Sequence, residues 1–313
     1  MMRRSEEISC LVYNISNVIN ENKLLMVKMG GTMTYKHEIA WVTDSTSTLP
    51  EEFVKNNHVY VVPLSISFGD ESYLEGVDIT AEDFYEKLAN SKVLPKSSQP
   101  AIGEFVELYK ELKEKYKHAI AIHASSSLTG TYQASVSASS MVEYQVEVID
   151  SKIGSYPLGK MISDGVKMQK EGKSYAEIVA YLRTLPEKAR LIMAPGSLEQ
   201  LHKGGRLSTT QVFIGSLIKL KLIVKFDDGK VILFDKIRTE RKVKERLFQL
   251  FEEASHLIEE ASIIHANIKE TAEEWRTELQ NKYPGIRFTT TMFSPVAGTH
   301  TGHGTIGFAW INK

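Results

Sequence analysis

Five hydroxyl side chains surround one glycine, Gly130, at the point where a short apolar run gives way to a helix. The apolar run, Ala119–His123, is typical of a buried strand in a parallel sheet. The amides of a first helical turn lack intrahelical partners, and the helix dipole favours negative charge there. One or two hydroxyls would suffice to cap the helix, so five favour an anion-binding site. The five are Ser125, Ser126, Ser127, Thr129 and Thr131.

Two histidines, His300 and His303, lie in the glycine-rich segment Ala297–Gly307. Glycine lets a backbone approach a ligand closely. The two imidazoles could share a metal ion, but no cysteine or clustered carboxylate nearby completes a ligand set. We therefore predict that a loop presents His300 to a polar ligand, whereas a solvated loop residue explains His303 equally well.

Two arginines are further candidates for contact with an anion. Arg206 directly follows a pair of glycines, and Arg238 lies beside a predicted helix start. A guanidinium forms two parallel hydrogen bonds with a carboxylate or a phosphate. Taken alone, however, each arginine is more often a solvated surface charge.

A small-molecule hydrolase is the rival interpretation, because Asp44, a serine and His300 could form a catalytic triad. The Gly-x-Ser-x-Gly elbow of many serine hydrolases does not occur in the sequence. A phosphate-binding P-loop is also missing, and too few residues follow Gly302–Gly307 for a dinucleotide-binding unit. The hydrolase therefore remains the alternative rather than the leading hypothesis.

Composition limits the class of protein. The 38 basic and 39 acidic residues nearly cancel, which argues against nucleic acid as a partner. The single cysteine, Cys10, rules out internal disulfides and fits a reducing compartment. Lysines interrupt the most apolar stretch, so no membrane span is predicted. We expect a soluble, cytoplasmic protein.

The elements that position these residues fall into two groups. Over residues 37–185, strands alternate with helices, which predicts a parallel sheet covered on both faces. Over residues 186–313 the pattern is mixed and includes a hairpin at Asp227–Gly229, which predicts an α+β domain. We interpret residues 1–36 as an extension that we expect to be mobile, with natural translation starting at Met29 or Met33.

Six short motifs occur in one order along the chain: Val42–Thr46, Lys96–Pro100, Ser125–Tyr132, Lys203–Arg206, Lys236–Thr239 and Gly298–Gly302. Together they resemble the DegV family, bacterial fatty-acid-binding proteins that act as lipid-binding subunits of fatty acid kinase. The resemblance runs from about residue 38 to the C-terminus. It implies an α/β, two-domain DegV-like fold, with a parallel-sheet N-terminal domain, a mixed α+β C-terminal domain and a buried acyl chain.

The same resemblance implies roles for particular residues. Two hydroxyls hold the fatty acid carboxylate, and they correspond to Ser97 and Thr129, with Ser98 adjacent. Ser97 replaces the usual threonine and Thr129 the usual serine, so both positions keep a hydroxyl donor. His300 corresponds to the family histidine near the carboxylate. Arg206 and Arg238 correspond to arginines near the head group or the kinase-docking face.

By this resemblance the protein binds a long-chain fatty acid and presents it to the catalytic subunit of a fatty acid kinase. The product, an acyl phosphate, is carried toward phospholipid synthesis, with at most transient membrane contact. The chain itself would supply no catalytic group and no cofactor. Burial of each methylene contributes roughly 0.8 kcal/mol, so the acyl chain would supply most of the affinity. A regulatory protein with an empty pocket is a third possibility.

Overall fold

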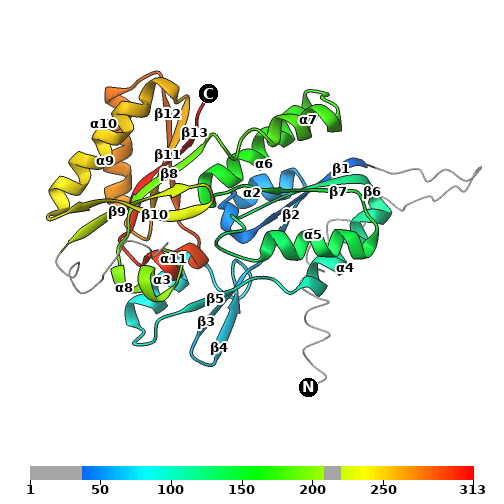
Figure 1. Ribbon diagram of the computed structural model, residues 1–313, viewed down its shortest axis with the longest axis horizontal. Coiled ribbons are helices and arrows are strands. Elements are labelled where there is room, and N and C mark those ends of the chain that lie inside the picture. Colours follow the sequence, from blue (N-terminus) through cyan, green and yellow to red (C-terminus); the bar gives the residue numbers. More distant parts are fainter. Residues whose placement is uncertain (1–36, 208–219) are drawn as a thin grey trace, which may run out of the picture. The chain divides into compact units, whose positions relative to one another are not determined.

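Four parallel strands form a sheet in the order β2-β1-β6-β7 (Figure 1). They are β2 (Val59–Val62), β1 (His37–Asp44), β6 (Tyr116–His123) and β7 (Val146–Asp150). This computed structural model describes residues 37–207 and 220–313, so the predicted extension, residues 1–36, lies outside the described part. Alternate side chains of β1 enter different cores: Ile39 and Trp41 point to one, Ala40 and Val42 to the other.

Helices cover both faces of this sheet, as the strand–helix alternation predicted. On one face, α4 (Ile102–Lys115) and α5 (Thr131–Val142) pack through Phe105, Tyr109 and the small side chain of Ala138. On the other face, α6 (Ser155–Lys170) and α7 (Tyr175–Leu182) contribute larger aliphatic side chains to a second core. A short helix, α2 (Glu51–Asn56), leads into β2.

A six-stranded mixed sheet follows in the order β10-β9-β8-β13-β11-β12. Leu191 and Met193 of β8 face the core shared with the parallel sheet, whereas Ile192 faces a third core. There, α9 (Glu240–Ala254) and α10 (Lys269–Lys282) cover the sheet. The strands are β8 (Ala189–Ala194), β9 (Lys221–Asp227), β10 (Lys230–Ile237), β11 (Glu260–His265), β12 (Arg287–Met292) and β13 (Ile306–Ile311).

A small antiparallel sheet, β4-β3-β5, completes the described part together with three helices. Its strands are β3 (Ser65–Phe68), β4 (Glu71–Leu74) and β5 (Lys96–Ser98), and the helices are α3 (Ala81–Asn90), α8 (Leu198–Lys203) and α11 (Pro295–Thr301). Two short 3-10 turns, η2 (Ser45–Ser47) and η4 (Ser255–Leu257), lie at element ends. In Figure 1, α11, α3 and α8 lie close together, and α11 packs against both of these helices and against β3 and β5.

Prolines at positions 95 and 100, on both sides of Ser97, are typical of a loop, yet this segment forms β5 because its backbone pairs with Ser65–Ser67 of β3. His300 was predicted on a loop, yet it lies in α11. The glycine at position 298 marks close packing rather than a loop, since a Cβ there would be 2.6 Å from the Tyr85 hydroxyl.

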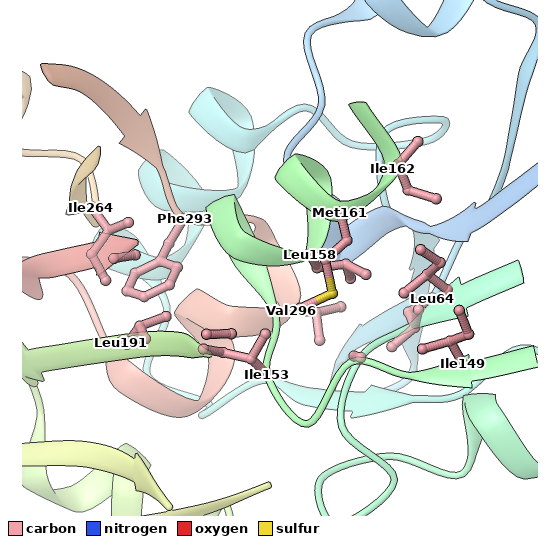
Figure 2. Close-up of a cluster of buried hydrophobic side chains, with 14 of the residues drawn as sticks. Leu64, Ile149, Ile153, Leu158, Met161, Ile162, Leu191, Ile264, Phe293 and Val296 are labelled. Carbon is pink, nitrogen blue, oxygen red and sulfur yellow. The ribbon is translucent and has the colours of Figure 1, made fainter. Parts of the chain in front are cut away.

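The largest core lies between the parallel sheet and the mixed sheet, and Figure 2 shows part of it. Leu64 and Ile149 lie on one side of this cluster and Leu191 and Ile264 on the other, with Leu158 of α6 between them (Figure 2). Both predicted sheet types are present, so the α/β fold-class prediction is confirmed. Residues 37–313 form one compact unit, and the domain boundary predicted at 185/186 stays a prediction. Within the described residues, no helix is long and apolar enough to cross a membrane.

Two glycine-to-alanine substitutions should have opposite effects on stability. In α6, a Cβ at Gly165 would overlap the buried ring of Trp41, so Gly165→Ala should destabilise the fold by about 1–3 kcal/mol. In α4, a Cβ at Gly103 meets nothing within 4 Å, so Gly103→Ala should stabilise by about 0.4–1 kcal/mol. Urea unfolding of both variants measures these changes. Equal effects would contradict the packing of α6 on β1.

Candidate ligand-binding site

A cavity of about 580 Å³ lies in the core between the two large sheets. This volume is in the range of small-molecule sites, about 300–1,000 Å³. Figure 2 labels five of its apolar lining residues, Leu64, Ile153, Leu191, Phe293 and Val296. Met193 of β8 and the hairpin residues Phe226 and Val231 also line it. One part of the cavity therefore suits a hydrocarbon group.

Polar residues from several segments also line the cavity. Ser97, Ser98 and Gln99 come from β5 and the residue after it. The segment Ser126–Gly130 follows β6 at the carboxyl end of the parallel sheet, where ligands bind in open α/β sheets. Arg206 follows α8, and His300 belongs to α11. The five predicted head-group residues thus line one cavity; their role in binding stays a prediction.

Ser97 and His300 are in direct contact. The Ser97 Oγ and His300 Nε2 atoms are 2.7 Å apart. The other ring nitrogen, Nδ1, is buried and has no partner within the described residues. It faces Gly204, where a Cβ would come within 2.5 Å. Burial, and then the charge of Arg206, lower the pKa of His300 to about 4, so the imidazole is neutral at neutral pH.

Arg206, which lies near His300, connects two loops by hydrogen bonds. Its Nε donates to the Leu128 carbonyl at 3.3 Å, and its Nη1 donates to the Gly204 carbonyl at 2.6 Å. Burial lowers the pKa of Arg206. A guanidinium has five N–H groups, so donors remain for a ligand.

The hydroxyl-rich segment does more than cap α5. At the helix start, Thr129 Oγ1 lies 2.8 Å from Thr131 Oγ1 and accepts a hydrogen bond from the Thr131 amide at 3.4 Å. Ser125 Oγ instead donates to the Gly229 carbonyl of the β9–β10 turn, and Ser126 bonds to Asp150. A Cβ on Gly130 would overlap the Gln99 side chain, so this glycine allows Gln99 to lie over the helix start.

Arg238 and His303 lie elsewhere. Both side chains are exposed, and neither lines the cavity. Arg238 forms no ion pair within the described residues, whereas the ring of His303 lies 6.4 Å from that of Tyr85. In residues 37–207 and 220–313, no group of three or more His, Cys, Asp and Glu side chains is placed to hold a metal ion.

Asp44 pairs with His123, not with His300. Asp44 Oδ2 accepts from His123 Nδ1 at 3.2 Å and from the Ala124 amide at 2.8 Å. His123 Nε2 then contacts Ser135 Oγ at 3.0 Å, and that oxygen contacts the Tyr109 hydroxyl at 2.5 Å. Asp44, His123 and Ser135 are fully buried and none of them lines the cavity. We therefore interpret these hydrogen-bonded side chains as stabilising the fold. The predicted catalytic triad, in which Asp44 would pair with His300, is therefore wrong.

The sequence interpretation missed His123, although a signal was present. Thr43 of β1 pairs with Ile122 of β6, so the next residues on these parallel strands, Asp44 and His123, must lie side by side. An acid and a histidine at neighbouring strand ends therefore indicate a contact once the strand order is known.

The low pKa of His300 makes stability depend on pH. The folded value of about 4 lies below the ordinary 6.5, so the unfolded chain binds more protons between these values. His300 therefore contributes stability that is present above pH 6.5 and is lost as the pH falls toward 4. We expect acidification to destabilise the ligand-free wild type more than His300→Gln, by up to about 3 kcal/mol. Urea unfolding between pH 4 and 7 measures the difference, and parallel curves would contradict it.

Comparisons with known proteins agree with this architecture. A family model described as “Uncharacterised protein, DegV family” matches residues 38–313. A DegV domain-containing protein of Halalkalibacterium halodurans is 41% identical over 278 residues, which span 87% of this chain and 98% of that protein.

Solved structures of the family have the same fold. DegV of Bacillus subtilis, described as a fatty acid binding protein, is 38% identical with a TM-score of 0.81, covering 88% of this chain and 100% of that one. A stearic acid-binding protein of Eubacterium ventriosum is 26% identical with a TM-score of 0.80, covering 90% and 99% of the two chains. The family model matches residues 38–313, and the relative from Halalkalibacterium halodurans is 41% identical over 98% of its own length. The chain therefore belongs to the DegV family.

Proposed function

We propose that this chain binds a long-chain fatty acid, with the hydrocarbon along the apolar wall and the carboxylate at the polar end. The observation that carries the proposal is one cavity lined both by many apolar side chains and by the hydrogen-bonded Ser97–His300 pair. The fatty-acid binding described for Bacillus subtilis DegV supports it. Burial of a dozen methylenes at roughly 0.8 kcal/mol each supplies ample affinity.

The polar end meets the needs of a buried carboxylate. Such a group is heavily penalised unless donors surround it. The hydroxyls of Ser97 and Thr129 and the unused N–H groups of Arg206 are donors on this side. We assign the proton of neutral His300 to Nε2, which donates to Ser97 Oγ and leaves the Ser97 proton for the ligand. This assignment leaves buried Nδ1 without a proton that would need an acceptor.

Binding is favoured over hydrolysis by the surroundings of the same pair. A serine nucleophile needs a histidine that takes its proton, and a carboxylate usually stabilises the imidazolium that forms. His300 Nδ1 has no such partner within the described residues, and the neighbouring charge is Arg206. A positive neighbour opposes the imidazolium, so the pair is suited to hold a carboxylate rather than to attack an ester.

Removal of both hydroxyls should weaken binding. Each hydrogen bond to a charged group contributes about 1.5–3 kcal/mol, so Ser97→Ala with Thr129→Val should weaken affinity by a few kcal/mol. Titration of delipidated protein with a fluorescent fatty acid measures the change. Ser72→Ala with Thr277→Val makes the same chemical changes at exposed sites outside the cavity and should bind as the wild type. Unchanged affinity of the first pair would refute the head-group assignment.

We further propose that the bound fatty acid is presented to a separate ATP-dependent kinase in the cytoplasm. The chain then carries the acyl phosphate toward phospholipid synthesis, with at most transient membrane contact. Exposed Ser98 and Gln99 at the polar end support access from outside. Arg238, exposed and without an ion pair in the described part, is our docking residue, and no cofactor is required.

A kinase assay with ATP and the loaded protein tests this partnership. Arg238→Glu should raise the KM for the loaded protein by about tenfold or more and leave fatty-acid affinity unchanged, because a reversed charge opposes docking. Arg241→Glu changes a neighbouring exposed arginine that already pairs with Glu245, and it should have the smaller effect. Equal KM values for the wild type and Arg238→Glu would rule out this docking role.

A further inference from the structure

One buried carboxylate, that of Glu75, does not line the cavity but contacts residues that position its wall. It follows β4, and its side chain is 4% exposed. No Lys, Arg or His in the described residues forms an ion pair with it. Its oxygens accept hydrogen bonds from Ser45 Oγ, from the Val296 amide at 2.9 Å and from the Ser294 hydroxyl. Burial of a carboxylate without a cation is costly, so these bonds need an explanation.

The bonds from Val296 and Ser45 connect the start of α11 to another lining residue of the cavity. Val296 is the second residue of α11 and lines the cavity. Ser45 accepts from the amide of Leu64 at 3.0 Å, and Leu64 also lines the cavity. His300 lies four residues after Val296, about one helical turn further along α11. Glu75 is therefore linked to both the apolar wall and the histidine.

Other contacts hold the rest of α11 but leave its first amide to Glu75. Ser294 caps the helix by accepting from the Ala297 amide at 3.5 Å. Gln200 of α8 donates to the carbonyls of Gly298 and Thr299, at the middle of the helix. Tyr85 of α3 donates to the Phe293 carbonyl, just before the helix. A negative charge at a helix start is also favoured by the helix dipole.

The groups that face Glu75 differ in charge and in element. Asp44 at the end of β1 is a like charge, Tyr85 of α3 is a neutral phenol, and Ser45 and Ser294 are hydroxyl donors. Burial is the largest effect and raises the pKa of Glu75 to about 7, and the charge of Asp44 acts in the same direction. None of these groups replaces the bond to Val296.

We propose that Glu75 is a positioning residue for the ligand site, because its carboxylate fixes the start of α11 and thereby places His300 against Ser97 and Val296 against the ligand. The acyl-chain part of this inference rests on the proposed function. The placement of His300 does not, because it concerns a contact within the protein itself, between His300 and Ser97.

The placement of His300 is tested in ligand-free protein by NMR of its imidazole, with the signal assigned by its loss in His300→Gln. Glu75→Ala should shift or broaden this signal, whereas Glu75→Gln, which keeps an oxygen for the Val296 amide and an N–H for Ser45, should restore it. Glu75→Asp keeps the charge but shortens the reach, and it should also shift the signal. A folded Ala or Asp variant with the wild-type signal would overturn the inference.

Fatty-acid affinity provides the second readout. Glu75→Ala should bind at least about tenfold more weakly, and Glu75→Gln within about threefold of the wild type, as expected for loss and rescue of a hydrogen bond to a helix amide. Leu279→Ala, in the core on the other side of the mixed sheet, lowers stability without touching α11 and should bind as the wild type. An equal loss of fatty-acid affinity in Leu279→Ala and Glu75→Ala would overturn the positioning role of Glu75. Absence of binding by the wild type would refute the proposed function alone, because the NMR result still decides the placement of His300.

Discussion

The hydrogen bond between Ser97 and His300 joins residues 203 positions apart in the chain, and the site depends on it. Ser97 is in place because β5 pairs with β3, and His300 is in place because α11 is held by its neighbours. Neither segment is long enough to be stable alone, since short helices and strands rely on tertiary packing. The polar end of the cavity is therefore a product of the whole fold rather than of one local motif.

The arrangement of layers explains why a cavity exists at this place. Side chains of β1 and β8 alternate between cores, so each large sheet has one face covered by helices alone and one face turned to the shared core, where α6 contacts both sheets. The strand ends and loops of both sheets meet at that core, where the segment after β6 supplies hydroxyls and the β9–β10 hairpin supplies Phe226 and Val231. Apolar and polar linings thus occur in one cavity.

Much of the framework could be predicted, because periodicity and caps are local. The strand ending at His123, the hydroxyl turn and α5 were predicted from the sequence, and Ser174 forms a capping box with Glu177, three residues later. The features that were not predicted depend on contacts between residues that are far apart in the sequence. The glycines of α11 suggested a loop, since no local pattern reveals that Tyr85 packs against the helix. The hydrogen bond from the Val296 amide to Glu75 joins residues 221 positions apart, so no short sequence motif indicates it.

Lipid mass spectrometry of a denaturing extract tests most directly whether the cavity holds a fatty acid. Freshly purified protein should release about one free fatty acid per chain, and its length should fit a cavity of about 580 Å³. An empty extract, together with no binding of added fatty acids by the same protein, would contradict the claim.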